Sequence, residues 1–176
     1  PEEAAAMWIG TFHAFGLDII RRLGPEFSLP SDPRLMDRVE AVELLEAEFP
    51  RLALEHYQDL YDPTRLIGDI LAAISRAKDE VVGHDEYALR AEEMRIAAGS
   101  EEPQHTNALK AAEVARMYSV YERLKRDRRA IDFGDLVSLP VELLEKRHEI
   151  AAQLGQLYDH ILVDEYQDVN RASVRL

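Results

Sequence analysis

Two adjacent acidic residues, Asp164 and Glu165, are the side chains in this sequence that are best arranged to do chemistry. They directly follow the apolar residues 161–163, and this short β-branched-rich run predicts a buried parallel strand. Two carboxylates in a partly dry site repel each other and resist ionising, so a divalent cation would stabilise them. One carboxylate could then hold the hydrated metal while the other takes a proton from a water molecule. A pair of solvated turn residues is the alternative interpretation.

The residues around this pair form a longer and more specific string. Residues 163–170 read Val-Asp-Glu-Tyr-Gln-Asp-Val-Asn, which resembles motif II, the Walker B element, of the UvrD/Rep/PcrA-like superfamily 1 DNA helicases. The family pattern has threonine where this chain has Val169. The resemblance implies an ATP-dependent helicase or translocase that moves 3′ to 5′ on DNA and uses ATP and Mg²⁺. It also implies that Asp164 holds Mg²⁺ through water, that Glu165 is the base for the attacking water, and that Gln167 links the nucleotide state to neighbouring motifs.

A second candidate site lies near the start of the chain, where a short apolar run gives way to a helical pattern. Residues 7–9 predict a strand, and apolar residues at three- and four-residue spacing then predict a helix that Thr11 caps. A strand, turn and helix in this order present backbone N–H groups that suit a phosphate. Residues 10–16 read Gly-Thr-Phe-His-Ala-Phe-Gly and are similar to motif Ib of the same helicases, although Ala14 replaces a serine. The resemblance implies that Thr11 and His13 contact the backbone of single-stranded DNA; an ordinary capped helix with a surface histidine is the alternative.

The third candidate is a basic cluster at the end of a long predicted helix, residues 106–129. Cations at a helix C-terminus interact favourably with the helix dipole and are common on protein surfaces. Alternatively, the cluster follows a phosphate backbone, and Arg126, Arg128 and Arg129 are then candidate DNA-binding residues. The sequence leaves both interpretations open. The cluster consists of Arg123, Lys125, Arg126, Arg128 and Arg129.

Helical periodicity dominates the chain between the first and second motifs. A capping residue followed by proline predicts one helix that starts at Ser31 and another that starts at Asp62. Apolar residues recur along one face of each predicted helix, and such stripes indicate a packed core. The first stripe is Leu35, Val39, Val42, Leu45 and Phe49, and the second is Leu66, Ile67, Ile70, Leu71 and Ile74.

Helices are also predicted over residues 84–98 and 149–157, and residues 99–103 form a polar break before the long helix. Asp132 could cap a further helix, which Pro140 would bend or split. The surrounding string Asp-Phe-Gly-Asp-Leu is similar to an Asp-Phe-Asp-Asp-Leu element of the helicase family, and we expect it to have a structural role.

The order of these elements predicts a mainly α fold, because strand signals occur only near the two ends. The resemblance implies a helical accessory domain inserted between two short strand–turn–helix pieces of a RecA-like P-loop motor domain. Residues 1–16 would be the N-terminal motor piece, residues 17–157 the accessory domain called 1B, and residues 158–176 the C-terminal motor piece. The phosphate loop G-x-x-x-x-G-K-[ST] does not occur in the 176 residues. We therefore expect this chain alone neither to hydrolyse ATP nor to unwind DNA.

Composition narrows the possible partners and the cellular compartment. The chain has 34 acidic against 21 basic residues and a net charge of −13, which argues against non-specific DNA binding by the whole surface. The absence of cysteine excludes disulfides and thiolate metal sites and suits a reducing cytoplasm. No apolar run approaches membrane-spanning length, so no membrane partner is expected. The start at Pro1 suggests an excised fragment.

Two other functions fit parts of this pattern. One is a non-catalytic helical interaction module that keeps a relic motor motif, and the other is a helicase–nuclease subunit of a recombination complex. For the helicase interpretation, the expected partners are single-stranded DNA, duplex/single-strand junctions and the rest of the motor, in DNA repair, replication or recombination. The two predicted strands would have open edges, so self-association is a further expectation.

Overall fold

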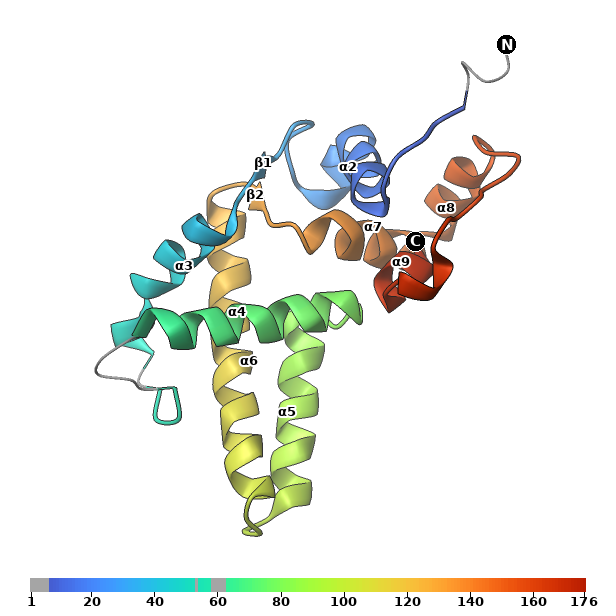
Figure 1. Ribbon diagram of the computed structural model, residues 1–176. Coiled ribbons are helices and arrows are strands. Elements are labelled where there is room, and N and C mark those ends of the chain that lie inside the picture. Colours follow the sequence, from blue (N-terminus) through green and yellow to red (C-terminus); the bar gives the residue numbers. More distant parts are fainter. Residues whose placement is uncertain (1–6, 53, 58–62) are drawn as a thin grey trace.

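The computed structural model describes residues 7–52, 54–57 and 63–176, and most of its regular structure is helical. This confirms the mainly α class, while the RecA-like arrangement stays a prediction. Figure 1 shows α3, α4, α5 and α6 on one side of the molecule and α2, α7, α8 and α9 on the other. The helices are α2 (Phe12–Arg22), α3 (Arg38–Glu46), α4 (Pro63–Asp79), α5 (His84–Ala98), α6 (Gln104–Asp127), α7 (Asp135–Lys146), α8 (His148–Gly155) and α9 (Arg171–Arg175), with 3₁₀ turns η1 (Gly24–Phe27), η2 (Phe49–Arg51) and η3 (Tyr166–Asp168).

Helices α5 and α6 form an antiparallel hairpin that projects from the rest of the chain, and α4 lies across its base (Figure 1). The predicted polar break forms the tip, where Gly99 adopts a φ of 55° that favours glycine. The predictions of helices at 84–98 and 106–129 are thus confirmed to within two residues. The predicted cap at Asp62 lies outside the described residues, although α4 does begin at Pro63. None of the described helices combines the length and the apolar composition needed to cross a bilayer.

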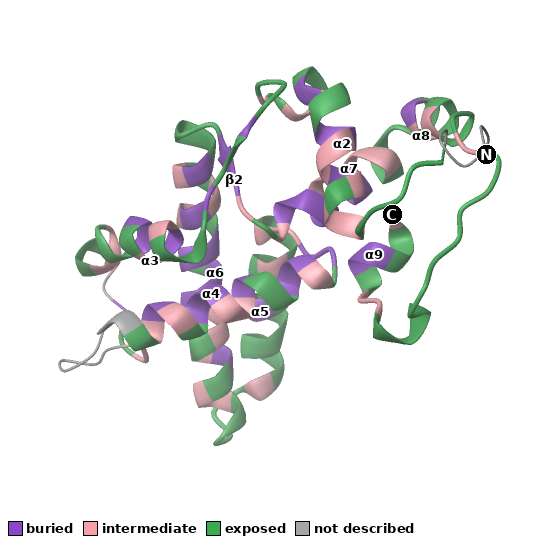
Figure 2. Cartoon of the chain, turned by 45° about the horizontal axis from the view of Figure 1, so that its top comes forward, coloured by how far each residue is buried: buried purple, intermediate pink, exposed green. Residues whose placement is uncertain are grey.

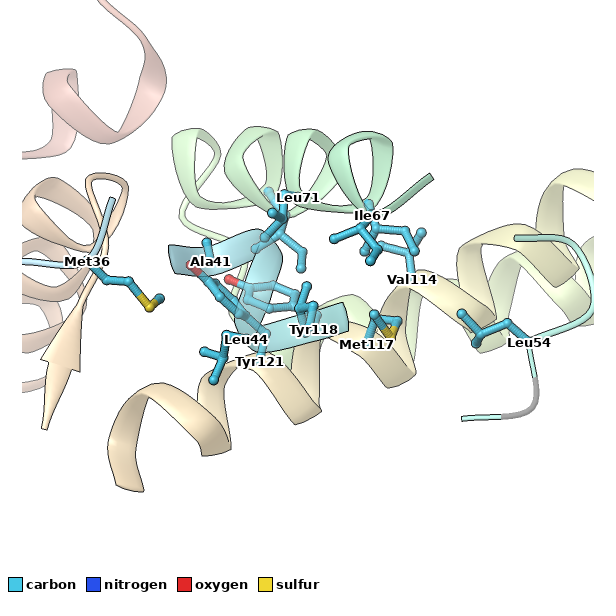
Figure 3. Packing of buried hydrophobic residues seen from close by; sticks show 14 of the residues in the cluster. Met36, Ala41, Leu44, Leu54, Ile67, Leu71, Val114, Met117, Tyr118 and Tyr121 are labelled. Carbon is cyan, nitrogen blue, oxygen red and sulfur yellow. The ribbon is translucent and has the colours of Figure 1, made fainter. Parts of the chain in front are cut away.

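The main hydrophobic core lies where α3, α4 and α6 meet. Ile67, Ile70 and Ile74 recur along α4 at helical spacing, and all three are almost fully buried. Burial of one such side chain contributes about 1.5–3 kcal/mol. Figure 2 shows buried residues gathering where α4 and α6 meet. Figure 3 shows α4 facing aromatic and aliphatic side chains from α6, among them Val114, Met117, Tyr118 and Tyr121.

A short parallel strand pair, absent from the prediction, joins the start of α3 to the end of α6. Strand β1 (Arg34–Leu35) pairs with β2 (Ala130–Ile131), with Arg34 opposite Ala130. Because each strand has only two residues, neither shows the alternation by which strands are recognised. The predicted helix start at Ser31 is therefore wrong.

Helix α3 starts instead at Arg38, because Asp37 forms a capping box with Glu40. The Asp37 side chain accepts from the Glu40 backbone N–H, and the Glu40 side chain accepts from the Asp37 N–H. The later start changes the buried face of the helix. Leu35 and Val39, which were expected in the core, are exposed, and the helix buries Ala41, Leu44 and Leu45.

The two strands expected next to the motifs are not formed. Residues 7–9 and 161–163 have no regular structure, and Ile161 and Leu162 are 72% and 92% exposed. A strand needs a neighbour that accepts and donates its backbone hydrogen bonds, and within the described residues neither segment has one. The expectation of self-association through open strand edges stays a prediction.

Close packing of α2 against α7 organises the side of the molecule that carries the motifs. A side chain at Gly16 would place its Cβ 1.7 Å from the Leu136 carbonyl oxygen, so only glycine permits this approach. Helix α7 continues through Pro140, which is buried, and the expected split does not occur. The N-cap residue of α7 is Gly134 rather than Asp132, although the Asp132 carboxylate does accept from the N–H of Asp135, the first residue of the helix, at 3.0 Å.

Candidate functional site

The acidic pair lies in an exposed bend rather than at the end of a buried strand. Asp164 and Glu165 are both exposed, and Glu165 has a left-handed backbone with a φ of 50°. The Asp164 Oδ1 atom accepts from the Glu165 N–H at 2.9 Å, and the Gln167 amide donates to Glu165 Oε2. The premise of two charges repelling in a dry site is therefore wrong for this chain. The three predicted residues do form one local cluster, with their polar groups at the surface.

Helix α9 follows this bend and anchors it. The Asn170 side chain caps α9 by accepting from the Ser173 N–H at 2.9 Å. Ala172 is 2% exposed and packs in a small cluster with Val81 and Val141. The backbone at the end of the 163–170 segment is thereby held against α7 and the end of α4.

The N-terminal candidates occupy the first turn of α2. The Thr11 hydroxyl accepts from the Ala14 N–H at 3.2 Å, which confirms the predicted N-cap. The His13 ring stacks on the Phe133 ring with the ring centres 3.9 Å apart. Partial burial lowers the pKa of His13, while the Asp79 carboxylate acts in the opposite direction. His13 is thus a half-buried ring that links α2 to the loop before α7.

The two candidate segments meet on a common support. Both α2 and α9 pack on α7, so the Thr11 end of α2 and the end of the 163–170 segment are positioned by the same helix. Figure 1 shows α2 and α9 on either side of α7. The basic end of α6 lies next to β2 and contacts the start of α7 through the Lys125–Asp135 ion pair.

The basic cluster divides into exposed and buried residues. Arg126, Arg128 and Arg129 are exposed, as a phosphate contact requires. Arg128 also donates to the Leu124 carbonyl at 3.3 Å, which fits the helix-dipole interpretation. Lys125, in contrast, is 2% exposed, so its side chain is not part of the exposed basic surface.

Lys125 belongs to a buried network of five charged side chains. Its ammonium group lies 2.8 Å from Glu122, 3.1 Å from Asp132 and 2.5 Å from Asp135. Lys78, from the end of α4, contacts the same three carboxylates at 2.9, 2.6 and 2.6 Å. Three carboxylates and two ammonium groups therefore share one site. It joins α4, α6, the loop before α7 and the first residue of α7.

The two lysines favour ionisation of the carboxylates around them, although burial still raises the pKa of Asp135 above its ordinary value. Burial disfavours the charged form of Lys78, but the carboxylates around it raise its pKa well above the ordinary value. Burial likewise opposes the ionisation of Asp132 and Glu122, and the two lysines nevertheless lower the pKa of both. Oxygens of Glu122, Asp132 and Asp135 lie close enough together to bind a metal ion. The two ammonium groups already supply the positive charge there, so we assign the network to structure rather than to metal binding.

This network was missed by sequence reasoning, although one signal was available. Lys125 continues the buried stripe of Tyr118 and Tyr121 at four- and seven-residue spacing, and its ammonium lies 5.0 Å from the Tyr121 ring centre. Because Lys125 is charged, it was expected to be exposed and was counted in the basic cluster. The contribution of Lys78 could not be read from the sequence, because it comes from a helix about 50 residues away.

The chain resembles known helicases over its whole length. The UvrD/REP helicase N-terminal domain family matches residues 1–176. The ATP-dependent DNA helicase PcrA of Leuconostoc citreum is 29% identical over 96% of this chain and 20% of its own length. Rep of Salmonella typhimurium is 28% identical over 99% of the chain and 23% of its own length, and UvrD1 of Mycobacterium bovis is 31% identical over 97% and 20%. This chain spans about a fifth of the length of these relatives.

The family match covers the N-terminal helical turn, the projecting hairpin and the exposed acidic bend in one continuous stretch. Relatives that bear three different names are all ATP-dependent DNA helicases. The chain therefore belongs to the UvrD/REP helicase N-terminal domain family.

Proposed function

We propose that this chain is part of the motor of an ATP-dependent DNA helicase or translocase that moves 3′ to 5′ on DNA. The proposal rests on the family match over residues 1–176, together with an exposed Asp164–Glu165 pair in a string that resembles motif II. The relatives are named as ATP-dependent DNA helicases.

The acidic bend has the donor chemistry that a nucleotide-bound Mg²⁺ needs. Magnesium prefers oxygen ligands and retains several of its waters, and exposed Asp164 leaves room for those waters. Asp164 would hold the ion through water, and the ion would neutralise charge on the phosphates. Glu165 would take the proton from the attacking water. Gln167 already donates to Glu165, so it would orient that carboxylate and make it sensitive to neighbouring segments.

DNA binding would depend on local groups, because the chain as a whole is acidic. Thr11 and His13 would contact the backbone of a single strand at the start of α2. Arg126, Arg128 and Arg129 would contact phosphates near a duplex/single-strand junction, guided by the projecting helices. Residues 17–157 would form the accessory part, and residues 1–16 and 158–176 would be motor pieces.

ATP turnover by the full-length gene product, measured with and without a dT oligonucleotide, tests this proposal. We expect turnover that single-stranded DNA stimulates. Glu165→Ala should abolish turnover while leaving nucleotide affinity within about threefold, because a lost proton acceptor costs about 10²–10⁴-fold in rate. Glu93→Gln on the exposed face of α5 is the matched control and should change neither quantity.

Three results would count against parts of this proposal. Loss of nucleotide binding in Glu165→Ala would give Glu165 a structural role. A full-length product that contains no phosphate loop and has no ATP turnover would instead favour the non-catalytic interaction module. A nuclease domain in that product would favour the helicase–nuclease alternative.

A further inference from the structure

The turn that ends α4, residues 79–81, contacts the segment that follows the acidic bend. The Asn170 amide donates to Asp79 Oδ1 at 2.7 Å, and Arg171 lies 3.6 Å from Glu80. Val81 packs in the same buried cluster as Ala172. Consecutive residues of the 79–81 turn thus meet consecutive residues at the start of α9.

The amide of Asn170 is fixed from both sides. Its oxygen accepts from the Ser173 N–H at 2.9 Å, so its nitrogen must point away from α9 and toward Asp79. A hydrogen bond from an amide to a carboxylate is stronger than one between neutral groups. The orientation of Asn170 is therefore set by α9 and α4 together, two residues after Asp168 in the bend.

The backbone of the 79–81 turn has an unusual conformation that depends on the packing of Val81 beside Ala172. The Val81 N–H donates to the Lys78 backbone carbonyl at 2.9 Å, and the Val82 N–H donates to the Ala77 backbone carbonyl at 2.8 Å, which is the Schellman pattern at a helix end. The residue at the left-handed position of this motif is usually glycine, yet here it is Val81, with a φ of 57°. A β-branched residue is strained in this conformation. Its side chain is 8% exposed in the cluster with Ala172, so packing holds it there.

The same turn reaches α2. The Asp79 carboxylate acts electrostatically on His13, and Phe12 packs on the cluster that contains Val81. His13 is held in turn by its stack on Phe133. Residues from α2, α4 and the start of α9 therefore converge on three consecutive positions of one turn.

We propose that the 79–81 turn is a positioning element that couples the start of α2 to the acidic bend, with Asp79 and Asn170 as its positioning residues. The inference rests on the proposed function: a strand bound at Thr11 and His13 would change ATP turnover at Glu165 through this turn. Coupling between two sites is typically worth a 5- to 150-fold change. The contact is built from one charge-assisted hydrogen bond, one exposed ion pair and buried packing, and the hydrogen bond can be removed by changing either Asp79 or Asn170.

The test is a double-mutant cycle in the full-length gene product. Asp79→Ala removes the acceptor, and Asn170→Ser removes the amide donor while keeping a good N-cap for α9. The readout is the ratio of ATP turnover with saturating dT oligonucleotide to turnover without it. We expect each variant to lower this ratio about fivefold or more, and the double variant to be no worse than the worse single one.

Two control variants distinguish a loss of coupling from a general disruption of the local structure. Asp79→Asn retains an acceptor oxygen and should recover most of the ratio. Glu80→Gln breaks only an exposed ion pair of the same turn and should leave the ratio within about twofold. Amide exchange of residues 171–175 provides a readout that needs no activity, and Asp79→Ala should accelerate it relative to α8.

Unchanged ratios in both single variants, or losses that add in the double variant, would overturn the inference while the proposed function stands. Unchanged exchange over residues 171–175 in Asp79→Ala would also overturn it. A wild-type product whose ATP turnover does not respond to DNA would overturn the proposed function and the coupling together.

Discussion

Removal of one lysine from the buried network should destabilise the fold more than removal of one of its acids. Lys125 and Lys78 face Glu122, Asp132 and Asp135, so the five groups carry a formal charge of −1 when all are ionised. Lys125→Met keeps most of the side-chain volume but leaves three carboxylates around one ammonium, a charge of −2. Glu122→Gln brings the same site to zero.

The size of the effect follows from burial. Lys125 is 2% exposed, so its loss strands carboxylates that water cannot reach, and breaking a buried ion pair from one side costs about 3–5 kcal/mol. For a chain of this size, each kcal/mol lowers the unfolding midpoint by about 2–4 °C, which predicts a fall of about 6–20 °C. Glu122→Gln keeps an oxygen at the position that lies 2.9 Å from the Lys78 ammonium and 2.8 Å from the Lys125 ammonium. The ammonium groups remain charged, so only the negative charge of the acceptor is lost, and the cost should stay below about 2 kcal/mol.

Thermal and urea unfolding followed by far-UV circular dichroism would measure both variants. Lys110→Met, on an exposed position of the same helix, is the matched control and should lie within about 0.5 kcal/mol of the wild type. The reasoning would be refuted by a Lys125→Met variant that costs less than about 1 kcal/mol. A Glu122→Gln variant more destabilised than Lys125→Met would refute it as well.

Other substitutions test the helix packing and the electrostatics around α2. Gly16→Ala should cost about 1–3 kcal/mol in unfolding free energy, because its Cβ would lie 1.7 Å from the Leu136 oxygen, whereas Gly155→Ala in α8 meets nothing within 4 Å and should be neutral or stabilising. Equal effects of the two in urea unfolding would show that α2 can move away from α7. Asp79→Asn should lower the pKa of His13 further, since the carboxylate raises it against the effect of burial. NMR titration of the His13 ring measures this shift, and a pKa that rises would contradict the assigned geometry.

The long helices could be predicted from sequence because their signals are local. Residues 84–98 and the apolar stripe of α4 depend on spacing along one helix, and both predictions were confirmed. The start of α3 was missed, since the capping box at Asp37 outweighs the proline signal at Ser31. Strands β1 and β2 depend on pairing across about 95 residues, which no local pattern reveals.

The residues of the candidate site could be predicted from local sequence motifs, but the contacts between those motifs in space could not. Thr11 caps its helix as expected, and Asp164, Glu165 and Gln167 form one cluster. The Asp79 contact with Asn170 depends on how α4 ends in space, and nothing in either local sequence indicates it. Whether these groups bind nucleotide and DNA stays a prediction.

The projecting hairpin would convert a small rotation at its base into a large displacement of its tip. Helix α6 has 24 residues and is therefore about 36 Å long, with its C-terminal end fixed in the buried charge network and its other end at the tip. A rotation of about 10° at that fixed end would displace the tip by about 6 Å, on the scale of one helical turn. The chain has no cysteine, so a Ser100→Cys label at the tip, paired with a second introduced cysteine on α2, would report such a rotation as a distance change. The stiffness of the five-charge network then sets how far the tip travels.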